Sequence, residues 1–142
     1  MKLVCHLLDS KGRDVLSIGP DASVLDAIKL MSDKGIGALV VMDGDTMAGI
    51  VTERDYARKV ILKGRASETT PVRDIMSVDV VTTSSHESVE KCMNTVTDLR
   101  IRHLPVVDDG KVCGIISIGD LVKAIIADQQ HAIEQLEHYI SG

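Results

Sequence analysis

Aromatic side chains are almost absent from this chain of 142 residues, which has no Trp, no Phe and only two Tyr. Proteins that bind single-stranded nucleic acid stack bases on aromatic rings, so the chain lacks the side chains of that class. Basic residues are outnumbered as well, because 16 Lys and Arg stand against 21 Asp and Glu and the formal net charge is −5. A nucleic-acid partner is therefore not expected.

Long hydrophobic runs are also missing. No apolar stretch reaches the length of a membrane-spanning helix, and the N-terminus has no hydrophobic signal segment. The three cysteines, Cys5, Cys92 and Cys113, show no Cys-x-x-Cys spacing, which favours buried structural thiols in a reducing compartment. We therefore expect a cytoplasmic protein with no membrane partner.

The sequence also lacks catalytic and metal-binding motifs. The sequence has no glycine-rich Walker loop, no nucleophile elbow and no His-Glu-x-x-His pattern, so no catalytic residue is assigned and an enzyme is not expected. His131, Glu134 and His138 have helical spacing, but three ligands from one helix would make an open, exposed site. A solvated helix face is the favoured interpretation, and no metal site is predicted.

What the sequence does contain is an internal repeat with an offset of 65 residues, which runs without a gap from Leu16 to Ile61. Most of the matched positions are apolar residues or turn residues, as a shared fold requires. They include Ser23 with Ser88, Val41 with Val106, Asp43 with Asp108, Gly49 with Gly114, Ile50 with Ile115 and Asp55 with Asp120. The chain is therefore two copies of one supersecondary unit.

Each copy is predicted to fold as β-α-β-β-α, which gives an α+β protein. In the first copy we expect strands at 15–18, 38–42 and 46–51 and helices after Ser23 and after Thr52. In the second copy we expect strands at 80–83, 104–107 and 111–116 and helices after Ser88 and after Ser117. Pro105 cannot donate to a ladder, so its strand should have an edge or an opening there. Short helical segments at 4–8 and 72–76 precede the copies.

The predicted boundaries follow the chain. Residues 1–64 form the first repeat with its N-terminal helical segment, 65–70 the linker, 71–128 the second repeat and 129–142 a helical extension. The last helix shows a heptad seam made of Val122, Ile126, Gln129, Ile133, Leu136 and Ile140. A partner subunit, giving a homodimer, is one explanation for this seam. Folding of the helix back onto its own module is the other.

The stretch 49–55 returns as 114–120, and both copies have an apolar strand, a hydroxyl residue and a carboxylate three positions later. One interpretation is a capping box, in which Thr52 or Ser117 caps a helix and Asp55 or Asp120 reaches back. The other is one end of a nucleotide site, because a helix N-terminus attracts phosphate and a carboxylate accepts ribose hydroxyls. Duplication of the pattern strengthens the second interpretation, and both stay open.

These features resemble a tandem pair of cystathionine-β-synthase (CBS) domains. The resemblance rests on residues 49–58, 100–108 and 72–76 and covers the chain up to about residue 128. The chain is similar to a stand-alone pair of bacterial type without an attached enzyme or transporter. The resemblance implies two units packed through their sheets about a pseudo-twofold axis, and two such modules commonly form a disc-like dimer. It also implies clefts for an adenosyl ligand such as AMP, ADP, ATP, NAD(H) or S-adenosylmethionine.

In the family, the motif hydroxyl contacts phosphate and the motif carboxylate binds ribose, which carries onto Thr52, Asp55, Ser117 and Asp120. Arg54 is either a second phosphate contact or a solvated side chain. Arg102 and His103 start a strand that faces the cleft in the family, where the first copy has Gly37 and Ala38. They are either phosphate contacts, with His103 able to donate a hydrogen bond or add charge near neutral pH, or a rim pair without a ligand. Aliphatic side chains are expected to hold the adenine: Ile18, Ile50, Val80 and Ile115, with Pro105 beside them.

Two main hypotheses follow. The first is a sensor module that binds an adenine nucleotide and reports energy or redox state to an unknown regulated protein. The second is a structural interaction module whose clefts are empty or vestigial. The presence of both Asp55 and Asp120 favours the first hypothesis. A hydrolase or synthetase that acts on the nucleotide is a third, poorly supported hypothesis, because no catalytic motif accompanies the repeat.

Overall fold

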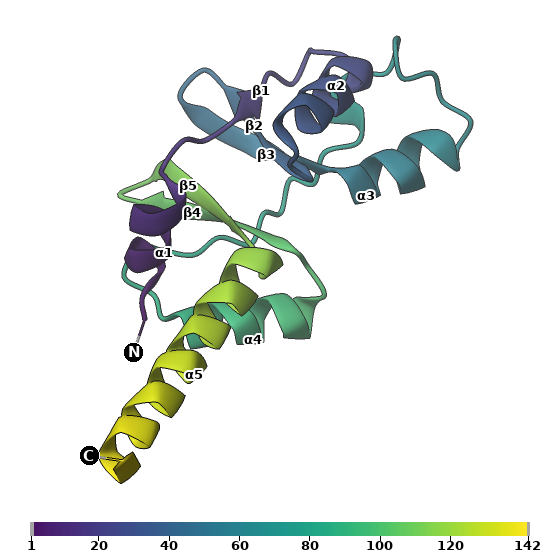
Figure 1. The fold of residues 1–142 in the computed structure, drawn as a ribbon. Coiled ribbons are helices and arrows are strands. Elements are labelled where there is room, and N and C mark those ends of the chain that lie inside the picture. The colour runs from purple at the N-terminus through teal and green to yellow at the C-terminus, as the bar shows by residue number, and fades with distance from the viewer. Residues whose placement is uncertain (1, 142) are drawn as a thin grey trace. The chain divides into compact units, whose positions relative to one another are not determined.

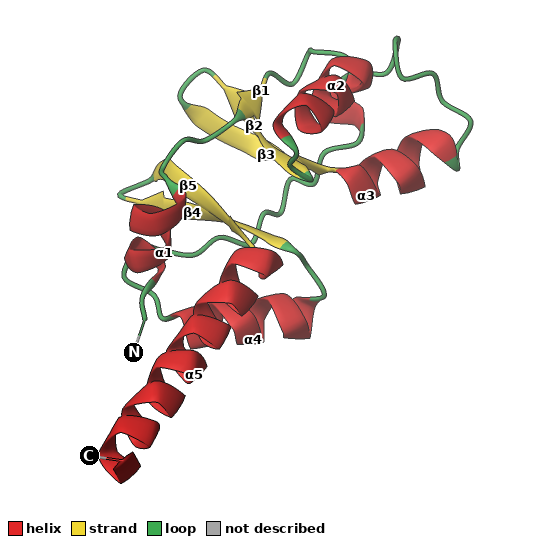
Figure 2. Ribbon diagram, viewed as in Figure 1, coloured by secondary structure: helices red, strands yellow, loops and turns green. Residues whose placement is uncertain are grey.

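The computed structural model describes residues 2–141 and divides into two compact units (Figures 1 and 2). The first-repeat unit is Val15–Val81. The second-repeat unit combines the segment that ends at Asp14 with the segment that begins at Thr82. Each unit combines an antiparallel hairpin with helices, so the predicted α+β class is confirmed.

The first-repeat unit is built on a three-stranded sheet. Its strands are β1 (Ser17–Ile18), β2 (Ala38–Asp43) and β3 (Thr46–Thr52), with β1 parallel to β2 and β2 antiparallel to β3. Its helical elements are α2 (Val24–Lys34), α3 (Glu53–Tyr56), the π-helix η1 (Ala57–Ile61) and the 3₁₀-helix η2 (Val72–Asp74). One core joins α2, β2, β3 and η2, and its fully buried side chains include Leu39, Val51 and Ile75.

The second-repeat unit has a two-stranded sheet, β4 (His103–Asp108) and β5 (Lys111–Ser117), paired antiparallel. Its helices are α1 (Val4–Lys11), α4 (Val89–Leu99) and α5 (Ile118–Ser141). The two hairpins repeat each other in detail, because a register irregularity falls at Val41/Met42 in one and at Val106/Val107 in the other. These positions are equivalent under the 65-residue offset, so the predicted duplication extends to the strand irregularities.

Helix starts and ends follow the expected caps. The side chain of Ser23 accepts a hydrogen bond from the Asp26 N–H, and Ser88 accepts one from the Lys91 N–H, both at 3.1 Å. Gly35 ends α2 in the left-handed conformation, which is typical of glycine at a helix C-terminus. Its equivalent at the end of α4 is Arg100, which adopts the same conformation at φ 55° without being glycine.

The leading segments pack on the repeat that does not follow them directly. The N-terminal segment joins the second-repeat unit, where the N–H of Val4 donates to the Glu87 carbonyl at 2.9 Å. The segment after the linker joins the first-repeat unit, where the N–H of Val72 donates to the Ala22 carbonyl at 2.8 Å. The boundaries 1–64 and 71–128 therefore describe the repeats along the chain, whereas packing exchanges their leading segments.

The prediction of a strand at 80–83 is wrong, because this segment forms only one isolated bridge, between Thr83 and Val106. The reason lies in Pro105. In the first-repeat unit, the N–H of Val40 donates to the Leu16 carbonyl at 3.4 Å beside β1. The equivalent donor in the second copy would be residue 105, and proline has no N–H. The predicted opening at Pro105 therefore prevents the third strand from extending.

The cysteines only partly match the expectation of buried thiols. Cys92 is buried, and this burial raises the pKa of its thiol. Cys5 and Cys113 are half-buried, so for them the expectation of full burial is wrong. All three are free cysteines.

Two glycines allow the leading segments to cross the hairpins. A β-carbon at Gly49 would lie 2.5 Å from the Ser77 carbonyl oxygen, and one at Gly114 would lie 2.7 Å from Leu8 Cδ2. Ser77 also exchanges two backbone hydrogen bonds with Ile50, of 2.9 and 3.0 Å. Gly49 is therefore required by close packing against the exchanged segment, whereas a β-carbon at Gly114 would have to displace the Leu8 side chain.

We expect Gly49→Ala to destabilise the protein by about 1–3 kcal/mol, because the added methyl group meets a hydrogen-bonded backbone oxygen. Gly114→Ala should cost less, since it meets the end of a flexible leucine side chain. Gly19→Ala is the control, because a β-carbon there has no heavy atom within 4 Å. Urea unfolding of the three variants tests this order. Equal stability of Gly49→Ala and Gly19→Ala would contradict the role of Gly49.

Candidate functional site

In the first-repeat unit, the repeated motif forms a complete capping box between β3 and α3. The Oγ1 of Thr52 accepts the N–H of Asp55 at 3.1 Å and donates to Oδ2 of the same aspartate at 3.1 Å. Oδ2 also accepts the N–H of Thr52 at 3.0 Å. The capping interpretation is therefore correct, and it fixes the orientation of the Asp55 carboxylate.

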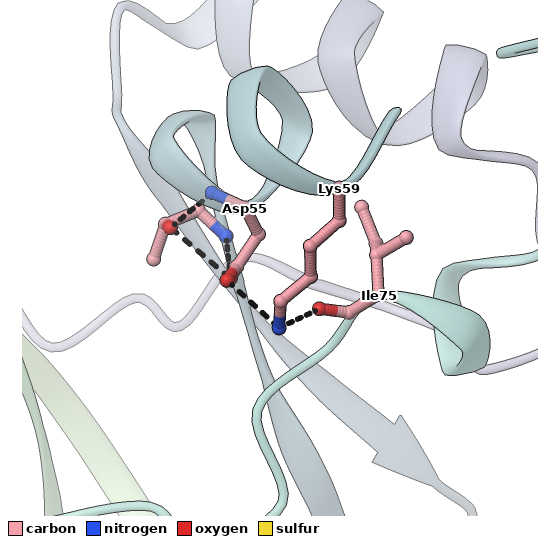
Figure 3. A network of polar contacts seen from close by, with 4 residues as sticks. Asp55, Lys59 and Ile75 are labelled. Carbon is pink, nitrogen blue, oxygen red and sulfur yellow. Dashed lines mark hydrogen bonds and ion pairs between the residues drawn. The ribbon is translucent and has the colours of Figure 1, made fainter. Parts of the chain in front are cut away.

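The other oxygen of Asp55 faces a lysine. Lys59 Nζ lies 3.3 Å from Asp55 Oδ1 and donates to the Ile75 carbonyl at 2.8 Å (Figure 3). Lys59 lies in η1, a π-helical turn, and such turns occur often at functional sites. The predicted helix from Thr52 to about Leu62 therefore forms, but its second half is π-helical. The lysine connects the motif carboxylate to the segment that follows the linker.

The second-repeat unit repeats this geometry at Ser117 and Asp120. The Oγ of Ser117 accepts the N–H of Asp120 at 3.2 Å, and Oδ2 of Asp120 accepts the N–H of Ser117 at 2.8 Å. The same Oδ2 receives Lys11 Nζ at 2.5 Å. Lys11 is the last residue of α1, in the exchanged N-terminal segment. Each motif aspartate therefore has a cap at the helix start and a lysine partner, which comes from the following helical turn in the first-repeat unit and from α1 in the second.

Strand register brings the predicted partners to the same place in each unit. Ala38 pairs with Thr52, and His103 pairs with Ser117. The carbonyl of Gly37 accepts the N–H of Glu53 at 3.0 Å, and the carbonyl of Arg102 accepts the N–H of Ile118 at 2.8 Å. The two strand starts that were predicted as part of the site therefore lie beside the motif hydroxyls.

These bonds use two N–H groups in the first turn of each helix. One binds the strand-start carbonyl, and the other binds the motif hydroxyl. A helix N-terminus attracts phosphate through N–H groups that have no intrahelical acceptor, so fewer of them are available than the sequence suggested. The motif is better equipped to accept hydrogen bonds through its carboxylate than to donate them to phosphate.

The charges of the second-repeat unit set the ionisation of this site. Burial alone raises the pKa of the Asp120 carboxyl, but Lys11 and the Ser117 N–H stabilise the ionised form more, so the pKa lies below its ordinary value. Burial is the largest effect that lowers the pKa of His103, and Lys11 and Arg102 lower it further against the opposing effect of Asp120. The pKa of His103 therefore lies below its ordinary value, which disfavours the charged form, and a role in binding stays a prediction.

The other residues that the sequence predicted for the site lie farther from the motif aspartates or outside the strands. Ile18 pairs with Val41, three positions along β2 from Ala38, and packs against the core of its unit. Val80 lies outside any strand, in the last residues of the first-repeat unit. Arg54 and Arg102 are exposed, and Pro105 is buried in β4. Of the nominated residues in the second-repeat unit, Arg102, His103, Ser117 and Asp120 thus form one group.

Sequence reasoning missed the two lysines. Lys59 follows Asp55 by four residues, a spacing that favours an ion pair on a helix and was readable. Lys11 is 109 positions from Asp120 in the sequence. Only the exchange of the leading segment brings this pair together, so no local sequence pattern predicts the contact.

Within residues 2–141, no three His, Cys, Asp or Glu side chains gather as metal ligands, and no helix has the length and apolar character needed to cross a membrane. His131 lies on the exposed part of α5, where its Nε2 is 3.1 Å from Gln135 Nε2.

Comparison with known proteins identifies the architecture. The profile of the CBS domain matches residues 11–62 and 72–127. The CBS domain-containing protein CBSX3, mitochondrial, of Arabidopsis thaliana is 38% identical over 98% of this chain and 72% of its own length. A protein with CBS domains from Burkholderia ambifaria MC40-6 is 52% identical, with a TM-score of 0.87 over 90% of this chain and 96% of its own. The chain therefore belongs to the CBS domain family and carries two copies of the domain.

A further solved structure shows a ligand class in the family. The CBS domain pair of protein MJ0100, in complex with 5′-methylthioadenosine and S-adenosyl-L-methionine, is 25% identical to this chain. Its TM-score is 0.78 over 87% of this chain and 99% of its own. Both ligands of that protein contain adenosine.

The pKa of His103 predicts how stability depends on pH. Because the native pKa lies below the unfolded value of about 6.5, the native state binds fewer protons, and stability falls as the pH drops from about 6.5 toward the native pKa. His103→Gln should flatten this part of the profile, and His131→Gln, on the exposed part of α5, should not. Lys11→Met should raise the pKa of His103 in an NMR titration. A pKa of His103 at or above 6.5 would contradict the geometry.

Proposed function

We propose that the protein is a regulatory module that binds an adenosyl ligand at the two motif aspartates and signals to a regulated partner protein in the cytoplasm. The candidate ligands are AMP, ADP, ATP, NAD(H) and S-adenosylmethionine. The module itself carries out no catalysis. Membership in the CBS family and the adenosine-containing ligands of the MJ0100 pair support this proposal.

One observation carries the proposal. In both units the motif carboxylate accepts a donor from outside the helix start in addition to the capping N–H, namely Lys59 in one and Lys11 in the other. A cap alone requires only an acceptor for the backbone N–H. A carboxylate that is held by a cap and still accepts an external donor has the chemistry needed for a ribose hydroxyl.

The capping boxes also bear on the alternative function, a structural interaction module with empty clefts. The capping boxes give Asp55 and Asp120 a structural role, so their presence does not by itself favour a ligand. The ribose role therefore rests on the additional acceptor capacity and on the family. A binding measurement decides between the two functions.

Replacing both Asp55 and Asp120 with Ala should abolish binding of the adenosyl ligand, because each site loses a charge-assisted acceptor of the ribose hydroxyls. We expect a loss on the order of 2–4 kcal/mol of binding free energy at each site. Calorimetric titration with AMP, ATP, NAD and S-adenosylmethionine measures it, with single variants assigning each ligand to a unit.

The control must separate binding from folding, since both residues cap helices. Asp55→Asn and Asp120→Asn keep an oxygen for the cap and lose the charge, so they should unfold close to the wild-type temperature and still bind more weakly. Asp128→Asn removes another carboxylate of the second-repeat unit, which lies 3.7 Å from Lys2, and should bind normally. Full affinity in the double alanine variant would refute the ribose role. Absence of binding to the wild type would favour the interaction module.

Self-association is the second part of the proposal. α5 buries Leu121 and Ala124 within its unit, whereas the seam side chains Ile126, Ile133 and Leu136 are 56%, 49% and 62% exposed. The end of α5 extends beyond α4 and the sheet of its own unit (Figure 1). The helix therefore does not fold its seam back onto its own unit, and a homodimer that covers the seam is the proposal that this exposure supports.

Truncation after Asp128 should weaken the dimer, because it removes Ile133, Leu136 and Ile140 from the seam. Each of these side chains contributes about 1.5–3 kcal/mol when fully buried, before entropy costs. Light scattering over a concentration series measures the change. A matched full-length variant, Glu134→Gln, alters the helix outside the seam and should associate normally. If the truncated chain is as firmly dimeric as the intact one, another surface holds the dimer.

A further inference from the structure

The two motif aspartates are each engaged by a lysine that the repeat does not explain. Under the 65-residue offset, the equivalent of Lys59 is Ala124, which is buried in α5. The second-repeat unit has no lysine at that helix position and receives Lys11 from the N-terminal segment instead. Two lysines of different origin therefore reach equivalent carboxylates, so the contact is not simply inherited from the duplicated sequence.

Each lysine also connects its aspartate to a segment that joins the two units. Lys11 stands three residues before Asp14, where the chain leaves the second-repeat unit. Lys59 donates to the carbonyl of Ile75, six residues before Val81, where the chain leaves the first-repeat unit. Both crossings between the units thus begin close to a bond made by one of these ammonium groups.

The lysines occupy the acceptors that the proposed function assigns to ribose. Lys59 lies on Oδ1 of Asp55, the oxygen outside the capping box. Lys11 lies on Oδ2 of Asp120, which already accepts the Ser117 N–H. Both ammonium groups are partly exposed, with 43% and 36% of their side chains accessible, so exchange for another donor does not strand a buried charge.

We propose that Lys11 and Lys59 are internal competitors for the ribose carboxylates, and that a ribose which displaces them loosens the two segments joining the units. This inference rests on the proposed function. The ligand hydroxyls take over the carboxylate oxygens, and the released ammonium group returns to water. Ligand binding is thereby converted into a change at both connections between the units.

The test compares AMP with 2′,3′-dideoxy-AMP, which has the same base and phosphate without the ribose hydroxyls. Lys11→Met and Lys59→Met keep the aliphatic stem and remove the competing charge. AMP should bind about three- to tenfold more tightly to each variant than to the wild type, as expected for the loss of a half-exposed competing ion pair. The affinity for dideoxy-AMP should stay unchanged, because that ligand does not compete for the carboxylate.

Matched controls remove a lysine without touching the sites. Lys2→Met breaks the ion pair with Asp128 in the second-repeat unit, and Lys34→Met removes an exposed lysine at the end of α2. Both should bind AMP like the wild type. Placing Lys11→Met in an Asp55→Ala chain, and Lys59→Met in an Asp120→Ala chain, assigns each change to a single site.

The outcomes separate this inference from the proposed function. If the lysine variants bind AMP and dideoxy-AMP more weakly, the lysines are ligand contacts, and the competitor role is refuted. An unchanged AMP affinity refutes it as well, while binding itself still supports the proposed function. If the wild type binds none of AMP, ADP, ATP, NAD and S-adenosylmethionine, the proposed function fails, and this inference fails with it.

Hydrogen exchange tests the second half of the proposal. Saturating AMP should speed amide exchange of the wild type at residues 12–15 and 76–81, and Lys11→Met and Lys59→Met should show faster exchange at the respective segment without ligand. Exchange at these segments that does not respond to AMP or to the substitutions would refute the coupling.

Discussion

The reciprocal bonding of a hydroxyl residue and an aspartate at the end of a strand is the interaction on which the rest of each site depends. The last strand of each hairpin ends and the next helix begins at these pairs, Thr52 with Asp55 and Ser117 with Asp120. The same bonds hold the carboxylate in one orientation next to the start of the preceding strand. A capping box is a local structure, and here it also fixes the position of the group most suited to accept a ligand.

The second constraint is the exchange of leading segments between the repeats. Gly49 and Gly114 allow an exchanged segment to lie against each hairpin at a distance that a β-carbon would prevent. This crossing brings Ser77 onto β3 and Leu8 onto β5. It also delivers the Ile75 carbonyl to Lys59 and Lys11 to Asp120. Packing of the segments and the charge balance of the sites are therefore consequences of the same exchange.

The two sites are alike in their caps and different in their surroundings. Asp55 shares its carboxylate with a lysine of its own helical region, beside the small strand start Gly37 and Ala38. Asp120 receives its lysine from α1 and stands beside an exposed Arg102 and a half-buried His103, whose pKa is lowered mainly by burial. Any ligand therefore meets two different electrostatic environments, although the duplication created equivalent backbones.

Local patterns in the sequence determined the β-α-β-β-α order of the first repeat, most of that order in the second, the helix caps at Ser23 and Ser88, and the heptad seam of α5. These features depend on side-chain spacing and on bonds between residues a few positions apart, so they can be read along the chain. The loss of the strand at 80–83 was harder to predict, because it depends on the register in which residue 105 would have to donate its N–H to the carbonyl of residue 81. Only the tertiary structure decided the exchange of the leading segments, the pairing of Lys11 with Asp120 and the lowered pKa of His103. Those features join residues up to 109 positions apart, and they depend on burial and distances that no local pattern encodes.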